Sequence, residues 1–227
     1  MSRVTLRTDA PSAGSLAALL TDRVGAYEAH RLVWALFGDL ADRRRDFVFR
    51  VDWVAGRPQF LIVSERLPED DHYLFAIETK AYTPDLRAGD RLAFSTRVNP
   101  VVRRRQAGDR CRKFDIVMDE VRRRRDQGEK RVDRIAAAQA VLPDWLARQG
   151  QRLGFSLKSA DAGAEVHVEA YDTHRFRSAA GHGVSVASVE VRGLLRVEEP
   201  ERFLRALFRG MGSARAFGMG LLLVRRA

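Results

Sequence analysis

A histidine and a tyrosine that can take part in proton transfer lie close together in the segment YEAHRLVWALF. His30 follows Tyr27 at a spacing that places both side chains on one face of a helix. Histidine suits general acid or base catalysis because its unperturbed pKa of about 6.5 lies near neutral pH. The alternative interpretation is that both residues are half-buried members of an amphipathic helix, which is the commoner role of a lone helical histidine.

The other histidines are weaker candidates for the same chemistry. His72 follows an acidic stretch at 69–71, which disfavours the approach of an anion, and His167 alternates within a predicted strand. His174 and His182 bracket a predicted hairpin. No pair of histidines has the spacing of metal ligands beside a suitable carboxylate, so we predict that the protein uses no catalytic metal and no cofactor.

The chain is basic, and nearly all of its basic residues are arginines. Of its 227 residues, 40 are Lys or Arg and 30 are Asp or Glu, which gives a formal charge of +10. The only lysines are Lys80, Lys113, Lys130 and Lys158. Arginine binds two phosphate oxygens at once and also stacks on bases, so this bias favours a nucleic-acid partner. A codon-composition bias of the genome is the other explanation.

Composition also excludes several classes of protein. A hydrophobic content of 45% suffices for a core and excludes a disordered chain, and the length allows two domains. The single Cys111 excludes an intrachain disulfide and argues against a cysteine zinc site. No apolar run approaches the roughly 18 residues of a membrane span, and the stretch 16–20 is too short for a signal-peptide core. We therefore expect a cytoplasmic protein.

The first half of the chain alternates between the periods of a strand and of a helix. Apolar spacing predicts a helix over 27–37 and strands over 3–7, 47–53, 60–63 and 92–98. Strand, helix, strand pair and further strand is the order of a ferredoxin-like half, in which helices cover one face of an antiparallel sheet. We place its end near the turn Asn99-Pro100.

The second half repeats this order more loosely. Strands are predicted over 112–118, 155–157, 166–171, 184–197 and 221–224. Helical spacing covers 135–151, with a new helix beginning at Pro143, and a last helix opens at Pro200. The charge run 121–131 is expected to loop or fray in solvent. The predicted fold is α+β, with tandem ferredoxin-like (RRM-like) domains over 1–100 and 101–227.

Three stretches of the chain have a recognisable pattern: MSRVTL with the later YEAHRLVWALF, the segment DRLAFSTRVNPVVRRR over 90–105, and the strand, helix and glycine-rich loop over 190–224. Together they resemble the CasE family, the CRISPR RNA-processing endoribonucleases of the type I-E Cascade complex. The resemblance implies tandem ferredoxin-like domains and metal-independent cleavage of the CRISPR repeat stem-loop. It also implies that the product stays bound in a complex with other Cascade subunits.

The resemblance assigns catalysis to His30, with Tyr27 beside it to orient or share the proton. RNA can be cut without a metal because its own 2′-hydroxyl attacks the adjacent phosphate, which leaves a 2′,3′-cyclic phosphate and a 5′-hydroxyl. The protein then has to supply proton transfer and a group that stabilises the added negative charge on phosphorus. Whether His30 acts as acid or base stays open, because both roles use the same ring.

The resemblance also places a basic RNA-binding hairpin at THRFR, with His174, Arg175 and Arg177 as candidates. The alternate spacing of the two arginines puts both on one face of a strand, where a guanidinium could stabilise the phosphorane. An equally supported interpretation is an edge strand whose charges prevent it from pairing with other chains.

The glycine-rich loop GMGSARAFGMG is a second candidate for RNA contact. Gly210, Gly212, Gly218 and Gly220 permit positive φ and close approach of the backbone, so their amides are candidates for contact with a phosphate or base edge. Arg215 stands where the family has a lysine, which keeps a cation there. The alternative is a plain turn between a helix and the last strand.

Further arginines complete the predicted RNA surface. They are Arg31 beside His30, Arg97 in the R-x-N-P turn, and Arg103, Arg104 and Arg105 after it. A second run over 122–125 carries less weight, and both runs are also consistent with a solvated surface.

The competing hypothesis is a non-catalytic RNA-binding subunit of a CRISPR ribonucleoprotein. A metal-dependent nuclease would need more clustered carboxylates than the sequence offers.

Overall fold

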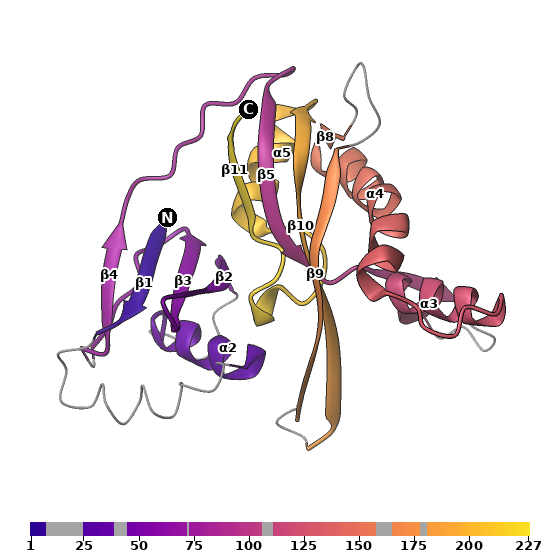
Figure 1. Cartoon of the computed structure of the whole chain (residues 1–227). Coiled ribbons are helices and arrows are strands. Elements are labelled where there is room, and N and C mark those ends of the chain that lie inside the picture. Colours follow the sequence, from indigo (N-terminus) through magenta and orange to yellow (C-terminus); the bar gives the residue numbers. More distant parts are fainter. Residues whose placement is uncertain (8–24, 39–44, 72, 106–110, 158–164, 178–180) are drawn as a thin grey trace.

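The computed structural model describes residues 1–7, 25–38, 45–71, 73–105, 111–157, 165–177 and 181–227. In this part of the chain, two antiparallel sheets carry helices, and a two-stranded arm extends from the second (Figure 1). This arrangement confirms the predicted α+β class. His72 and the apolar stretch 16–20 lie outside the described residues.

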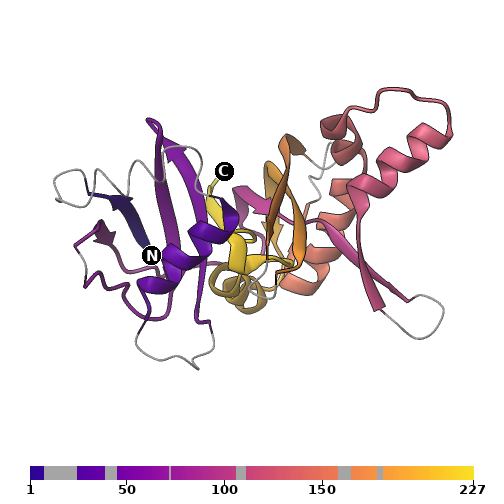
Figure 2. The ribbon, with the colours of Figure 1, turned by 90° about the horizontal axis from the view of Figure 1, so that it is seen from below.

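The first sheet has the strand order β2-β3-β1-β4 and carries helix α2 (Figure 2). Its elements are β1 (Ser2–Leu6), α2 (Ala26–Ala35), β2 (Phe47–Val54), β3 (Arg57–Ser64) and β4 (Phe75–Thr79). Helix α2 buries Ala29 and Val33 in a core with Phe60 of β3. Because these residues face the sheet, the other side of α2, with Tyr27 and His30, contacts the second half of the chain.

The second sheet has the strand order β11-β5-β10-β8, with β9 paired to β10. Its strands are β5 (Arg91–Val98), β8 (Phe155–Ser156), β9 (Val166–Arg177), β10 (Gly183–Val197) and β11 (Leu222–Arg226). A core with Phe94, Trp145 and Phe203 lies between one sheet face and the helices α4 (Arg134–Leu153) and α5 (Pro200–Arg209). The connected ends of β9 and β10 project beyond the sheet as a hairpin arm (Figure 1).

Strand β5 belongs to the second sheet, whereas the sequence analysis assigns it to the domain over 1–100. It pairs with β10 from Val98 opposite Val189 to Arg91 opposite Arg196, and with β11 on its other edge. The alternation of buried residues in a strand fixes its faces but does not identify its partners. We propose that the boundary between the two domains lies over 80–90, where the chain crosses from β4 to β5 (Figure 1).

An arm and a helix follow β5. They are β6 (Val101–Arg105), β7 (Cys111–Asp115) and α3 (Ile116–Asp126). The predicted strand over 112–118 therefore ends at Asp115, whose side chain accepts hydrogen bonds from the backbone N–H groups of Val117 and Met118. This cap satisfies two of the free donors at the start of α3, so the chain turns into a helix there.

Helix α3 covers much of the charge run 121–131, so the expectation of a loop over its first half is wrong. Val121 is buried in the core of the second domain. Glu120 accepts hydrogen bonds from both Arg123 and Arg124, which lie one helical turn further on. These bonds lower the pKa of Glu120 to about 2. The arginines are therefore held on the helix by the carboxylate instead of repelling one another.

Helix α4 continues through Pro143, where the sequence analysis expects a new helix to begin. A proline inside a helix removes one hydrogen bond and costs about 3 kcal/mol. Ala138 and Leu142 before it, and Trp145 and Leu146 after it, are all buried in one core. Packing on both sides of the proline therefore outweighs the loss. No helix in the described ranges is long and apolar enough to cross a membrane.

Apolar residues join the two sheets where their faces meet. Val48 and Val63 of the first sheet form a buried cluster with Leu221, which directly precedes β11. The two halves of the chain therefore meet along a shared apolar contact, against which Phe208 of α5 also packs.

An ion-pair network lies beside this apolar contact, and we call its four charged residues the junction network. Arg50 pairs with Asp52 at 2.6 Å and also with Glu190 of β10. Arg97 donates to Glu190 at 3.0 Å and to the carbonyl of Val51 at 2.8 Å. Burial alone would raise the pKa of Glu190, but the two arginines outweigh it and lower the pKa. Two positive and two negative charges thus neutralise one another at the junction.

Candidate active site

His30 lies half-buried on α2, where its ring reaches the glycine-rich loop. Its Nδ1 atom is 2.9 Å from the carbonyl oxygen of Ala216, 186 residues away in the sequence. Because a carbonyl oxygen only accepts hydrogen bonds, Nδ1 carries a proton and donates it. The other ring nitrogen, Nε2, is therefore the atom that can take up or deliver a proton.

The imidazole contacts Trp34 of its own helix at 6.0 Å and also belongs to a set of four rings from three elements, which we call the ring cluster. Its centroid lies 6.3 Å from that of Tyr27 and 5.7 Å from that of Phe217. Phe176 of β9 completes the set, at 5.9 Å from Tyr27 and 4.7 Å from Phe217. Helix α2, the β9–β10 arm and the 3₁₀ turn η1 (Arg215–Phe217) therefore meet at one place.

Two arginines lie near this cluster. Burial lowers the pKa of His30; the hydrogen bond to Ala216 opposes this shift, and the charge of Arg45 adds to it. Burial and the charge of Arg215 lower the pKa of Arg45 in turn. Within the described ranges, neither arginine forms a salt bridge with Asp or Glu. Cations that repel one another in a half-buried place favour a bound anion such as phosphate.

Arg45 is a residue that the sequence analysis does not assign to the site. It ends a run of three arginines over 43–45, shortly before the predicted strand at 47–53. That run was the only available signal, and it resembles several other arginine runs in the chain.

The glycine-rich loop over 210–220 folds back on itself and carries Ala216 to helix α2. Gly220 has φ +86°, and a side chain there would come within 2.2 Å of the carbonyl oxygen of Met211. Its N–H donates to the carbonyl of Arg97 at 2.6 Å, and its carbonyl accepts from Met211 at 2.8 Å. Only glycine fits this combination of backbone angle and close contact.

The loop glycines shape the site, and the geometry gives less support to RNA contact through their amides. The amides of Gly210 and Gly220 are already hydrogen-bonded to carbonyl groups of the protein. Gly218 is buried, and a side chain there would lie 3.2 Å from the ring of Phe49. Gly212 is exposed and is the one of the four that remains available to a ligand at the surface.

Arg97 and His174, two predicted RNA-binding residues, are engaged within the protein. Arg97 belongs to the junction network. The Nε2 atom of His174 is 2.8 Å from the hydroxyl of Ser188. Burial lowers the pKa of His174; Asp172 opposes the shift and Arg97 adds to it. Both side chains therefore have structural contacts, and we leave them out of the proposed RNA surface.

Arg175 lies on the side of β9 opposite to Phe176. Successive strand residues point to opposite faces, and Phe176 faces the ring cluster. Arg175 is exposed and so points away from His30. Arg175 is available to RNA along the β9–β10 arm, but it is badly placed to stabilise a phosphorane at His30. Arg177 ends β9, and its side chain lies outside the described part of the chain.

A groove of about 930 Å³, which we call the basic groove, opens between the β6–β7 arm, α4 and α5. Its lining includes many cations and, as far as the chain is described, no carboxylate. The cations are Arg103 and Lys113 of the arm, Arg148 and Arg152 of α4, Arg202, Arg205 and Arg209 of α5, and Arg215 of η1. Because Arg215 also lies near Arg45, the groove reaches the ring cluster.

The remaining predicted arginines differ in their surroundings. Arg104 pairs with Asp119 at 2.7 Å and lies over the ring of Phe114 at 5.3 Å, so its charge is partly neutralised. Arg105, at the end of β6, and Arg31, next to His30 on α2, are both exposed. Of the run 103–105, the groove includes Arg103 alone.

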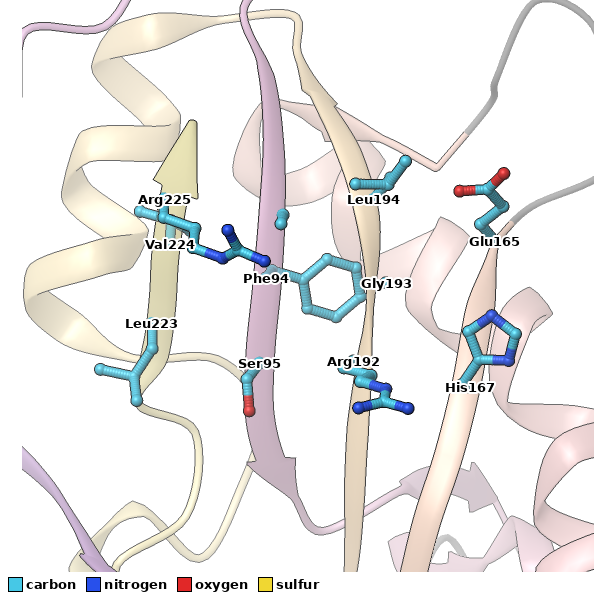
Figure 3. Close-up of a pocket in the computed structure, with 11 residues that line it drawn as sticks. Phe94, Ser95, Glu165, His167, Arg192, Gly193, Leu194, Leu223, Val224 and Arg225 are labelled. Atoms are coloured by element: carbon cyan, nitrogen blue, oxygen red, sulfur yellow. The ribbon is translucent and has the colours of Figure 1, made fainter. Parts of the chain in front are cut away.

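A second depression, of about 450 Å³, lies on the helix-free face of the second sheet (Figure 3). Arg192 and His167 lie opposite each other on paired strands at its edge, and Arg225 extends from β11. Arg192 is paired with Glu169 at 3.0 Å. This pocket shares no lining residue with the ring cluster or the basic groove. We assign it no part in the candidate site.

Metal ligands do not gather near His30 in the described ranges. No group of three His, Cys, Asp or Glu side chains there has the arrangement of a metal site. Independence of a metal stays a prediction, which cleavage assays in EDTA can test.

Comparisons with known proteins match the chain over most of its length. A family model described as CRISPR associated protein matches residues 1–226. The chain is 29% identical over 215 residues to the CRISPR-associated endoribonuclease Cse3 of Thermus thermophilus, and this match covers 89% of this chain and 91% of that protein. It is 26% identical over 202 residues to the CRISPR system Cascade subunit CasE of Escherichia coli, with 86% and 89% covered.

The three-dimensional comparison covers nearly the whole chain as well. A solved structure of the CRISPR endoribonuclease Cse3 bound to a 19-nucleotide RNA has a TM-score of 0.70 and 25% identity to this chain. The match covers 99% of this chain and 98% of that one. This likeness confirms the predicted tandem ferredoxin-like fold.

Proposed function

The chain belongs to the CRISPR associated protein family, and we propose that it is an endoribonuclease that processes CRISPR RNA as a subunit of a type I-E Cascade complex. It binds the repeat stem-loop, cleaves the precursor without a metal and keeps the product, in the cytoplasm. The likeness to Cse3 and CasE supports the enzyme class and the partners. The observation that carries the mechanism is a half-buried imidazole beside two arginines that have no carboxylate partner among the described residues.

His30 exchanges the proton in the proposed reaction. The 2′-hydroxyl at the cleavage point loses its proton as it attacks phosphorus, and the departing 5′-oxygen gains one. The bond from Nδ1 to Ala216 leaves Nε2 for this exchange. The lowered pKa keeps the ring neutral at pH 7, which favours the role of general base. Tyr27 lies beside the ring, where its hydroxyl can orient or share the proton.

Arg45 and Arg215 stabilise the phosphorane. The attack places extra negative charge on the phosphate oxygens, and a preorganised cation in a half-buried site meets that charge with little screening by water. A donor of this kind is typically worth about 3–4 kcal/mol in the transition state. Arg215 is anchored by a bond of 2.7 Å from its Nη1 to the carbonyl of Arg209, which reduces the freedom lost on binding.

The basic groove binds the stem. An A-form stem hides its base edges in a deep, narrow major groove, so recognition depends mainly on phosphate contacts and on shape. The groove offers cations from the β6–β7 arm, α4, α5 and η1, and Arg215 of η1 connects it to the ring cluster. A stem in the groove therefore brings its base to His30. Arg31 and Arg175 extend the same surface beyond the groove.

Cleavage by the purified chain in EDTA, with its own repeat RNA, tests this function. We expect His30→Ala to lower the single-turnover rate by about 10²–10⁴-fold, because it removes the acid or base, and to keep stem-loop affinity within about twofold. His167→Ala is the matched control, since His167 lies in the separate pocket on the sheet face. Cleavage that requires a divalent ion, or a His30→Ala variant that cuts at the wild-type rate, contradicts the proposal.

The competing hypothesis, a non-catalytic RNA-binding subunit, gives a different result in the same assay. Such a protein binds the stem-loop but leaves it intact, and His30→Ala has no cleavage to remove. The half-buried, cation-flanked imidazole favours the enzyme, because simple phosphate binding does not require a neutral histidine.

A further inference from the structure

Phe176 on β9 is a member of the ring cluster to which the sequence analysis gives no role. We propose that Phe176 is a positioning residue, which holds Tyr27 and, through Phe217, the carbonyl of Ala216 in place around His30. This inference rests on the proposed function, because it concerns the same reaction.

Tyr27 depends on Phe176 because the start of helix α2 is weakly fixed. Tyr27 lies in the first turn of the helix, and Gly25, the N-cap residue, has no side chain to cap it. Its aromatic neighbours in the described ranges are His30 and Phe176, and it stacks on Phe176 with an interplanar angle of 20°. This stacking is therefore the contact that sets the direction of the Tyr27 hydroxyl.

The turn η1 depends on the same ring. Ala214, which precedes the turn, has φ +59°, in the left-handed region that a residue with a side chain adopts at a cost. A turn of three residues that follows such a position needs contacts from outside to hold it. Phe217 provides them through Phe176 and His30. Ala216, whose carbonyl binds the imidazole, directly precedes Phe217 in the chain.

The geometry of β9 allows this role. Phe176 faces the cluster, and the exposed Arg175 lies on the opposite face of the strand. The ladder is regular at this point, with Phe176 opposite Val184 of β10. The arm therefore presents a defined ring to the site, and Val184 offers a control position on the same ladder rung.

The test measures single-turnover cleavage and stem-loop affinity separately, in variants of the full chain. We expect Phe176→Ala to slow cleavage at saturating RNA by about 10- to 100-fold, because displacements of about 1 Å near the chemistry cost that much. Phe176→Tyr keeps the ring and is expected to cleave within about threefold of wild type. Phe176→Leu keeps apolar volume without a ring and is expected between the two. Val184→Ala is expected to cleave at the wild-type rate.

The pH profile of cleavage adds a readout that a purely structural role does not move. Burial is the main cause of the lowered pKa of His30, and Phe176→Ala admits water to the cluster. The inflection of the rate profile should therefore move up toward about 6.5. The titratable groups around the ring are Tyr27 of α2, Arg45 before β2 and Arg215 of η1. The substitution removes none of the three, so the shift cannot come from the loss of one of these neighbours.

Two results overturn the inference without touching the proposed function. One is a Phe176→Ala variant that cleaves at the wild-type rate with an unchanged pH profile. The other is a variant that loses only stem-loop affinity. In both cases His30→Ala, assayed in parallel, still abolishes cleavage. If His30→Ala itself cleaves normally, the proposed function has failed, and the positioning role fails with it.

Discussion

The ring cluster and the junction network both have arginines at places where the two halves of the chain meet, but among the described residues only the junction network neutralises them. There, Arg50 and Arg97 face Asp52 and Glu190, and every charge has an opposite partner. At the ring cluster, Arg45 and Arg215 lie near each other and near His30, and burial together with the charge of Arg215 lowers the pKa of Arg45.

The difference teaches that the partner of an arginine indicates its role better than its position in the sequence does. Arg97 lies in a motif that points to RNA, yet its guanidinium is already held by a carboxylate and a carbonyl. Arg45 lies in an unremarked run, yet no carboxylate in the described ranges neutralises it. An uncompensated, half-buried cation costs stability unless an anion arrives, which makes it a functional candidate.

Removing an uncompensated cation is the strongest test of this contrast. We expect Arg45→Gln to lower the single-turnover cleavage rate by about 10²–10³-fold, because the phosphorane loses a preorganised guanidinium. The free energy of unfolding, measured in urea, should not fall and should rise slightly, since the variant removes an uncompensated cation and leaves no carboxylate of the described ranges without a partner. A variant that cleaves normally but unfolds easily would place Arg45 among the structural arginines.

Removing a carboxylate from the junction network should have the reverse effect. Glu190→Gln leaves Arg50 and Arg97, whose side chains are 10% and 25% exposed, without one negative charge. We expect the free energy of unfolding to fall by about 2–3 kcal/mol, less than for a fully buried pair. Cleavage per folded molecule should stay near the wild-type rate. Unchanged stability with reduced cleavage would give the network a part in catalysis.

Acid should reduce the difference in the free energy of unfolding between wild type and Glu190→Gln. The folded-state pKa of Glu190 is lowered, so its contribution to stability is present above its unfolded value of about 4.3 and is lost as pH falls through the folded-state value. The stability gap between wild type and Glu190→Gln, measured by urea unfolding, should therefore narrow from pH 7 toward pH 3. A gap that stays constant over this range contradicts the charge pairing.

Cations of the basic groove should have smaller, additive effects on binding alone. We expect Arg148→Gln to weaken stem-loop affinity by several-fold and to reduce the slope of log affinity against log salt by about 1, because one phosphate contact is lost. Arg192→Gln, at the pocket on the sheet face, is the matched control and should leave both quantities unchanged. Equal losses in the two variants would mean that the groove holds no preferred path for the stem.

Local patterns in the sequence predicted much of the fold. The alternation of Leu92, Phe94 and Val98 gave the buried face of β5, and the spacing around Val33 gave the helix α2, although not the whole of its buried face. Neither pattern identifies the partner of a strand, so the sequence analysis grouped β5 with the first half, although β5 pairs with β10 and β11. The helix over 116–126 was missed because its charges were interpreted as solvated, although Glu120 lies at the spacing that pairs it with Arg123 and Arg124.

The candidate site was only partly predictable for a related reason. The close spacing of Tyr27 and His30 is local, and it can be recognised in a helix. The bond from His30 to Ala216 joins residues 186 positions apart, and the contacts of Phe176 and Arg45 are just as distant from any local pattern. Whether a cation is neutralised by a carboxylate also depends on the tertiary fold. The sequence therefore could not show that Arg97 has a structural role and that Arg45 lies at the candidate site.

The most direct test of the account is cleavage of the repeat stem-loop in EDTA with and without a 2′-deoxy nucleotide at the cleavage point. We expect wild type to cut only the RNA with the 2′-hydroxyl, to leave a 2′,3′-cyclic phosphate, and to lose this activity in His30→Ala. Cleavage of the 2′-deoxy substrate, or a product with a 3′-hydroxyl, would contradict the proposed attack and the role of His30 in it.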